Sequence, residues 1–236
     1  MTSFPLPCGY PGIRVVHSFE ALLATPFESE CNAICWRREL PGDFEEVVRA
    51  LGAGSGIITI DDGRLRSLTL SEAGRGAVES LLCDQQRLRA LGQAPLLDCI
   101  DGYQRDVAAG PVPTDVHSFH VDSAPVATDT FLCCYTAPAS EGLRNDEAQR
   151  RVDDPTTRAQ LLERFGGTDG PEFVAHLSEH CFDLHYTPLP GARPFSFGVG
   201  NLWRIAVQYP GSPVRACIHR APPSLPGQLP RLLLIS

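Results

Sequence analysis

Apolar residues in the first hundred positions alternate between helical and strand spacing. A helical stripe begins after Asp43, which forms a capping-box pattern with Glu46, and it ends at Gly52. Ser71 precedes a second, longer stripe of the same period, and the apolar run at 56–61 between the two stripes predicts a strand. These patterns predict an α+β layer over residues 1–96.

From about residue 97 the chain changes to short apolar runs separated by proline and glycine, which is typical of strands joined by turns. Strands are predicted at 119–122, 128–136, 184–186, 195–199, 202–209, 216–219 and 231–236. Residues 138–190 interrupt this β region with helical patterns, one of them opened by Asp154 and Pro155. We therefore predict a β domain at 97–236 with a helical lid insertion at 138–190, since long excursions tend to be lids or binding loops.

Composition narrows the function classes. A formal charge of -8 and a pI near 5.3, without a block of lysine or arginine, argue against nucleic acid and anionic membranes as partners. No apolar stretch reaches the roughly 20 residues of a membrane helix. The nine cysteines are odd in number, and the first residues lack the basic start and apolar core of a signal peptide. These features predict a cytoplasmic protein with reduced thiols.

Candidate chemistry centres on residues 117–122, His-Ser-Phe-His-Val-Asp. His120 and Asp122 are two residues apart, so in a strand their side chains point to the same side. Together they supply two thirds of the two-histidine, one-carboxylate set that holds non-haem Fe(II). His219, in a predicted strand far along the chain, is the candidate for the third ligand.

A rival metal motif lies in the helical insertion. Residues 176–180 read His-Leu-Ser-Glu-His, which matches the inverted zincin signature of two imidazoles one helical turn apart. The related peptidases take a third ligand from a downstream glutamate, and no glutamate follows Glu179. Cys31 and Cys35 likewise lack a second pair at zinc-ribbon spacing. The simpler interpretation of residues 176–180 is that they are polar side chains on the exposed face of a helix.

The order His-x-Asp, distant His, then Arg231 at the start of the last strand resembles the Fe(II)/2-oxoglutarate-dependent dioxygenase superfamily. The resemblance covers roughly residues 97–236 and implies a double-stranded β-helix, the jelly-roll or cupin-like fold. More narrowly, residues 119–122, 132–136, 219–223 and 231–235 are similar to an uncharacterised bacterial family that is catalogued only as a domain of unknown function. The segment 32–37 resembles the N-terminal signature of that family.

This resemblance implies a role for each matching position. His120, Asp122 and His219 would bind Fe(II), and Arg231 would pair with the distal carboxylate of 2-oxoglutarate. A planar guanidinium suits that task because it binds a carboxylate through two hydrogen bonds and stays charged. In this superfamily a hydroxyl group often binds the same carboxylate of 2-oxoglutarate together with the arginine, and Tyr135 is the candidate for that hydroxyl. The implied activity is oxidation of a small-molecule substrate with O2, most simply hydroxylation.

Substrate contacts are the least constrained part of the prediction. His185 and Tyr186 follow the predicted lid, and an inward-facing Arg204 would neutralise an acidic substrate. Arg220 alternates to the opposite face from His219, so it is expected to point away from the metal.

Two alternative functions remain open: a cupin-like iron oxygenase that does not use 2-oxoglutarate, and a non-catalytic jelly-roll protein that binds a metal. The oligomeric state is not predicted.

Overall fold

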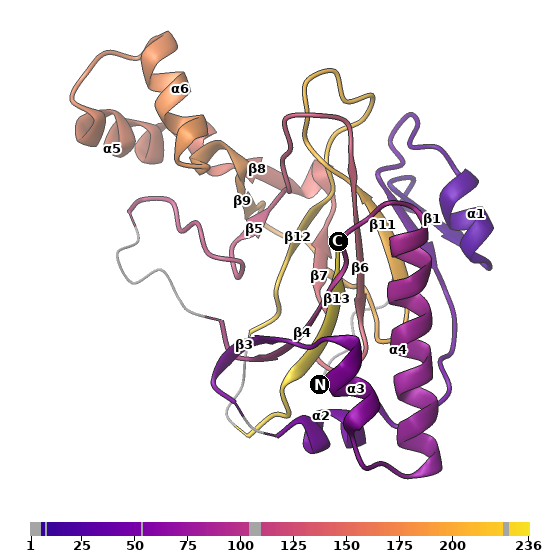
Figure 1. Cartoon of the computed structure of the whole chain (residues 1–236). Coiled ribbons are helices and arrows are strands. Elements are labelled where there is room, and N and C mark those ends of the chain that lie inside the picture. Colours follow the sequence, from indigo (N-terminus) through magenta and orange to yellow (C-terminus); the bar gives the residue numbers. More distant parts are fainter. Residues whose placement is uncertain (1–5, 8, 53, 104–109, 224–226) are drawn as a thin grey trace.

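The computed structural model describes residues 6–7, 9–52, 54–103, 110–223 and 227–236. Two β-sheets form the centre of the molecule (Figure 1). The seven-stranded sheet has the order β1-β2-β11-β6-β13-β4-β3, and its strands are Ile13–Val16, Ala33–Trp36, Leu202–Ala206, Asp129–Cys134, Arg231–Ile235, Leu96–Asp101 and Gly56–Thr59. The six-stranded sheet has the order β10-β7-β12-β5-β9-β8, and its strands are Phe195–Ser196, Glu141–Leu143, Ile218–Arg220, Phe119–His120, His185–Pro188 and Ala148–Arg150.

Six α-helices in the described residues accompany these sheets: α1 (Phe19–Ala24), α2 (Phe44–Leu51), α3 (Asp62–Ser67), α4 (Glu72–Ala90), α5 (Pro155–Phe165) and α6 (Pro171–Glu179). Local sequence explains most of their starts. The side chains of Asp43, Ser71 and Asp154 each accept a hydrogen bond from a backbone N–H in the first turn. The predicted capping box is only half formed, because the Glu46 carboxylate binds the Ser71 hydroxyl and N–H rather than its own helix.

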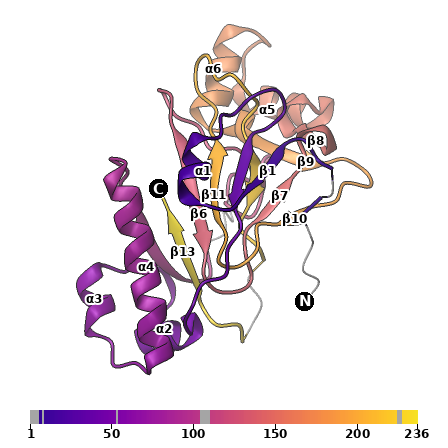
Figure 2. The same ribbon diagram turned by 90° about the vertical axis from the view of Figure 1, so that its right-hand side faces the viewer.

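Strand alternation divides the seven-stranded sheet into two faces. Phe131, Cys133 and Tyr135 of the β6 region point outward and pack with the apolar stripes of α2 and α4. Figure 2 shows α2, α3 and α4 together on one side of β13. Leu132 and Cys134 point the other way, which confirms that the two neighbouring cysteines face opposite sides. The outer face is therefore covered by helices, and the inner face meets the second sheet.

Aromatic side chains fill the space between the two sheets. Trp203 is fully buried there and stacks on Phe197, with ring centroids 4.4 Å apart. Gly142 of β7 permits this packing because a Cβ at that position would lie 2.3 Å from the ring of Phe195. One end of the same inner space holds the candidate site described below.

The N-terminal residues do not form a separate layer of strands. β1 and β2 extend one edge of the seven-stranded sheet, and β3 forms its other edge by pairing with β4. The fold is a mixed α/β arrangement in which N-terminal and C-terminal strands share a sheet. Every cysteine in the described ranges is a free thiol. None of the helices in the described part of the chain has the length and hydrophobicity needed to cross a membrane.

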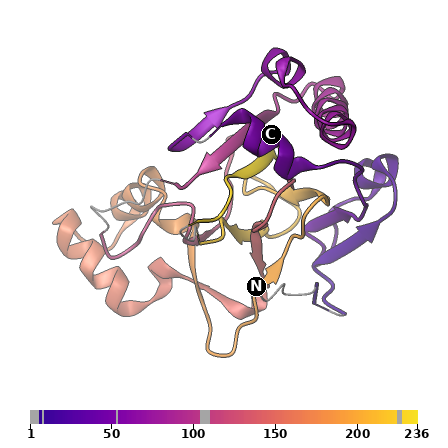
Figure 3. The ribbon, with the colours of Figure 1, turned by 90° about the horizontal axis from the view of Figure 1, so that it is seen from below.

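The insertion at 138–190 is less helical than the sequence predicts. It contributes two strands that were not predicted, β7 and β8, to the six-stranded sheet, together with β9, which overlaps the strand predicted at 184–186. Its helices α5 and α6 confirm the predicted helical patterns and share a small core formed by Val112, Val152, Leu161, Phe173 and Leu177. Seen from below, these helices lie on the other side of the molecule from α3 and α4 (Figure 3).

Candidate metal centre

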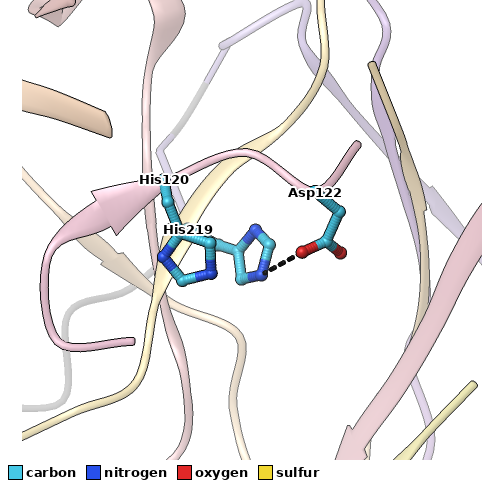
Figure 4. A group of neighbouring side chains, drawn as sticks. All are labelled: His120, Asp122 and His219. Carbon is cyan, nitrogen blue, oxygen red and sulfur yellow. Dashed lines mark ion pairs between the residues drawn. The ribbon is translucent and has the colours of Figure 1, made fainter. Parts of the chain in front are cut away.

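Three side chains from distant parts of the chain converge at one end of the space between the sheets (Figure 4). His120 ends β5, Asp122 lies just beyond it, and His219 is directly opposite His120 on the neighbouring strand β12. Their candidate ligand atoms all lie within 4.8 Å of one another, and His219 Nε2 is 3.7 Å from Asp122 Oδ1. This is the one such group of His, Cys, Asp or Glu in the described ranges, and it could hold a metal ion.

Backbone contacts orient both imidazoles. The Nδ1 atom of His120 lies 2.8 Å from the carbonyl oxygen of Ser118, and that of His219 lies 3.2 Å from the carbonyl oxygen of Cys217. A carbonyl only accepts, so each Nδ1 is the protonated nitrogen and each Nε2 keeps a lone pair. Histidine ligands in metalloproteins are held by this kind of contact. Both rings are thus set to bind through Nε2.

The carboxylate is held in a similar way. Thr130 of β6 donates its hydroxyl proton to Asp122 Oδ2 across 2.6 Å, which leaves Oδ1 facing His219. Burial raises the pKa of Asp122, but His219 and the Thr130 hydrogen bond more than offset that effect, so the pKa lies below its usual value. Burial and the neighbouring His219 lower the pKa of His120 to about 4. At neutral pH the site therefore presents a carboxylate and a neutral imidazole, the forms that bind metal.

A cavity of about 160 Å³ opens beside these three residues. Leu132, Leu233 and Ile235 supply its apolar wall from the seven-stranded sheet, while Tyr103 and Ser140 add hydroxyl groups. The volume is below the 300–1,000 Å³ usual for drug-sized ligands, so it suits a molecule of a few heavy atoms.

Arg231 lies behind Tyr103 and Ser140, two residues that line this cavity. It shares one face of β13 with Leu233 and Ile235, which line the cavity, because residues two apart in a strand point to the same side. The side chain is buried and donates to Pro138 O, Tyr103 Oη and Ser140 Oγ at 2.9, 3.2 and 3.1 Å. No carboxylate among the described residues pairs with it. Arg231 is therefore a buried cation whose hydroxyl neighbours face the metal ligands.

Three other predicted residues point away from the site, and strand alternation explains each case. Tyr135 lies on the outer face of the seven-stranded sheet, where its hydroxyl donates to Asp84 at 2.8 Å. Arg204 is also on that face, where it pairs with Asp129 at 2.6 Å and donates to backbone carbonyls at the end of α1. Tyr186 packs on the outer face of the six-stranded sheet. The predictions that placed these residues in the site are wrong.

His185 is the one predicted substrate residue that faces the inner space. It is opposite His120 in the β5–β9 register, and their ring centroids are 5.7 Å apart. Arg220 turns outward as predicted, with its guanidinium over the ring of Phe119 and paired with Glu141, although it also borders the cavity. Burial, reinforced by nearby Arg151, lowers the pKa of His185 to about 4.

The rival zinc motif gains no support from the geometry. His176 and His180 lie at the end of α6 with ring centroids 4.2 Å apart. His180 Nδ1 lies 3.0 Å from the carbonyl oxygen of His176, and within the described ranges no third ligand joins them. The α5 and α6 residues are also absent from the wall of the cavity beside His120, so these helices do not close it as a lid in this structure.

Three residues of the site are missed by the sequence patterns. Tyr103 and Ser140 lie between predicted elements, and nothing in their spacing points to Arg231. Thr130 lies in a predicted strand, but its contact with Asp122 depends on how the two sheets face each other.

No protein-family model matches this sequence, and comparisons with curated proteins and with solved structures return no similar protein.

Thr130→Val is expected to weaken metal binding about tenfold, because loss of a hydrogen-bond partner of a ligand typically costs 10–100-fold in affinity. Thr59→Val is the matched control, since the Thr59 hydroxyl donates to Asp98 at the same 2.6 Å on the surface. Competitive Fe(II) titration under nitrogen measures both variants. Equal affinity in the two variants would show that Thr130 does not position Asp122.

Proposed function

We propose that this protein is a non-haem Fe(II) oxygenase that uses 2-oxoglutarate and O2 to oxidise a small molecule. His120, Asp122 and His219 would bind the iron, and Arg231 would bind the distal carboxylate of 2-oxoglutarate. The observation that carries the proposal is a two-histidine, one-carboxylate group beside a buried arginine that has no carboxylate partner among the described residues. This donor set suits Fe(II) and leaves positions open for other ligands.

The strand order supports a double-stranded β-helix as the framework. Most successive strands from β4 to β13 alternate between the two sheets, apart from the β7–β10 segment, so that β11-β6-β13-β4 lie opposite β10-β7-β12-β5. Alternation of this kind is what a jelly roll of eight strands requires. It places the β5 and β12 ligands side by side and brings the arginine from β13 on the facing sheet. On this proposal β1, β2, β3, β8 and β9 are additions to the eight-stranded core.

The surroundings of Arg231 support carboxylate binding. A buried guanidinium without a counter-ion costs free energy that a bound carboxylate would recover. Tyr103 and Ser140 already contact Arg231 and also line the cavity, so their hydroxyls can join the same carboxylate. Tyr103 thus takes the role that the resemblance gave to Tyr135. The small cavity fits a five-carbon diacid better than a large ligand.

The balanced reaction takes 2-oxoglutarate, O2 and a substrate C–H to succinate, CO2 and a C–OH. Bound Fe(II) supplies the redox chemistry of this conversion, and the protein supplies position and a dry site. Arg231 and its two hydroxyl neighbours orient the co-substrate, while Thr130 and the two backbone carbonyls orient the ligands. Leu132, Leu233 and Ile235 give the cavity an apolar wall.

Anaerobic addition of Fe(II) and 2-oxoglutarate tests this proposal. A weak visible charge-transfer band is expected only when both are present, because the band reports the co-substrate chelating the iron. Iron binding without the band would favour the cupin-like oxygenase or the non-catalytic metal protein instead. Absence of iron binding would contradict both oxygenase alternatives.

Tyr103→Phe is expected to weaken 2-oxoglutarate binding about tenfold, because the variant loses one hydrogen bond to a charged group. Tyr135→Phe is the matched control: it removes a tyrosine hydroxyl on the opposite face of the sheet and should leave this affinity unchanged. Titration of the charge-transfer band measures both. A larger loss of affinity in Tyr135→Phe than in Tyr103→Phe would mean that 2-oxoglutarate binds on the outer face of the seven-stranded sheet, which would contradict the proposal.

A further inference from the structure

Three histidines form a row across the six-stranded sheet, and Arg151 follows the strand next to the last of them. His219 is opposite His120, and His120 is opposite His185. Residues opposite one another in a sheet point to the same face, so the three histidines share the inner face. In the next pair of strands Arg150 is opposite Tyr186, and Arg151 follows as the first residue of a 3-10 helix, Arg151–Asp153. The Arg151 charge is near enough to His185 to help lower the pKa of that histidine.

Buried polar atoms without partners occur on or next to three neighbouring strands of this sheet, β5, β9 and β8. His185 is 4% exposed and Ser118 is 7% exposed, yet His185 Nδ1 and Ser118 Oγ have no hydrogen-bond partner within the described residues. Arg151 Nε is buried and unpartnered too, and its guanidinium makes no ion pair with any described carboxylate. A buried polar group without a hydrogen-bond partner lowers the stability of the fold, and a ligand that pairs with the group restores that stability.

No described carboxylate forms an ion pair with Arg151, and this includes Asp183, whose buried Oδ1 has no hydrogen-bond partner among the described residues. Asp115 accepts from the backbone N–H groups of His117 and Ser118 at 3.0 and 3.2 Å. Asp153 pairs with Arg150, the neighbour of Arg151 that shares the outer face with Tyr186. The charge that would balance Arg151 is therefore not supplied by these carboxylates.

We propose that Arg151, with Ser118 and His185, binds a carboxylate of the substrate, which makes the substrate a small organic acid or amino acid. This inference rests on the proposed function, because it names the substrate of that same site. The co-substrate contact Ser140 precedes β7, whereas Arg151 follows β8, and β12, β5 and β9 lie between these strands. The two acids would thus approach the metal ligands from opposite sides. The oxidised carbon would lie several bonds from the substrate carboxylate.

A panel of straight-chain carboxylic acids and α-amino acids, each paired with its primary amide, tests the assignment. Two readouts are used: the shift in thermal unfolding midpoint of the iron-loaded protein without O2, and stimulation of succinate release with O2. At least one acid should act in both, and its amide should not. Arg151→Gln should weaken the effect of that acid about tenfold or more. Arg151→Lys should retain part of it, because the charge remains.

Arg150→Gln is the matched control, since Arg150 is adjacent in sequence but pairs with Asp153 on the outer face. It should respond to the acid as the wild type does. The assignment is overturned if no acid acts, if amides act equally, or if Arg151→Gln and Arg150→Gln respond alike. Failure of the proposed function has a different signature: succinate release and the charge-transfer band vanish for every protein, while the thermal shifts still report on Arg151.

Discussion

Asp122→Ala is expected to lower Fe(II) affinity by more than about 100-fold. It removes one of three ligands, and even the partners of ligands are typically worth 10–100-fold. The fold should survive, because Asp122 lines the cavity and its side chain accepts one hydrogen bond, from Thr130, among the described residues. Anaerobic Fe(II) titration followed by metal analysis of the desalted protein measures the loss.

His185→Gln is the control for this variant. His185 is close to His120, with ring centroids 5.7 Å apart, but it is not part of the ligand group. Its replacement should leave Fe(II) affinity within a few-fold of wild type. Metal loss in His185→Gln together with retention in Asp122→Ala would mean that three histidines, rather than the proposed set, form the site.

Asp84→Ala is expected to lower the free energy of unfolding by about 3–5 kcal/mol, the usual cost of removing one partner of a buried ion pair. Asp84 is 1% exposed on α4, and Arg38 binds both of its carboxylate oxygens. Tyr135 donates to it at 2.8 Å and Arg87 at 3.2 Å. The variant leaves the Arg38 guanidinium buried beneath the helix without its counter-ion. Urea denaturation followed by circular dichroism measures the change.

Asp62→Ala provides the comparison on the same helical layer. Asp62 also pairs with an arginine, Arg89 at 2.9 Å, but both side chains are partly exposed. Exposed pairs contribute about 0–1 kcal/mol, so the loss should be within that range. Equal losses in the two variants would show that the Asp84 network does not stabilise the packing of α4 on the sheet.

Local patterns predict the helices well because their signals are local. The starts of α2, α4 and α5 follow from Asp43, Ser71 and Asp154, each of which caps the first turn. The strands of the insertion are missed for the opposite reason. β7 and β8 are three residues long, and their pairing partners lie outside their own sequence neighbourhood. No local period distinguishes such strands from loops.

Alternation along a strand predicts which residues share a face but not which face is inward. The sequence pairs His120 with Asp122 on this basis, and the structure brings both beside His219. The same reasoning cannot orient Tyr135 or Arg204, because that depends on where the helices pack. Once Leu132 and Leu233 are known to line the cavity, the facing of every residue on β6 and β13 follows. The missing information is tertiary packing.

Succinate release is the sharpest test of whether this site is a 2-oxoglutarate-dependent oxygenase. Wild-type protein with Fe(II), 2-oxoglutarate and O2 is assayed beside Asp122→Ala, with the acid panel present as candidate substrates. The wild type is expected to form succinate, with CO2 in equal amount, and the variant is expected to form only the level seen without protein. Equal succinate from the two proteins, or none from an iron-loaded wild type across the whole panel, would contradict the proposed function.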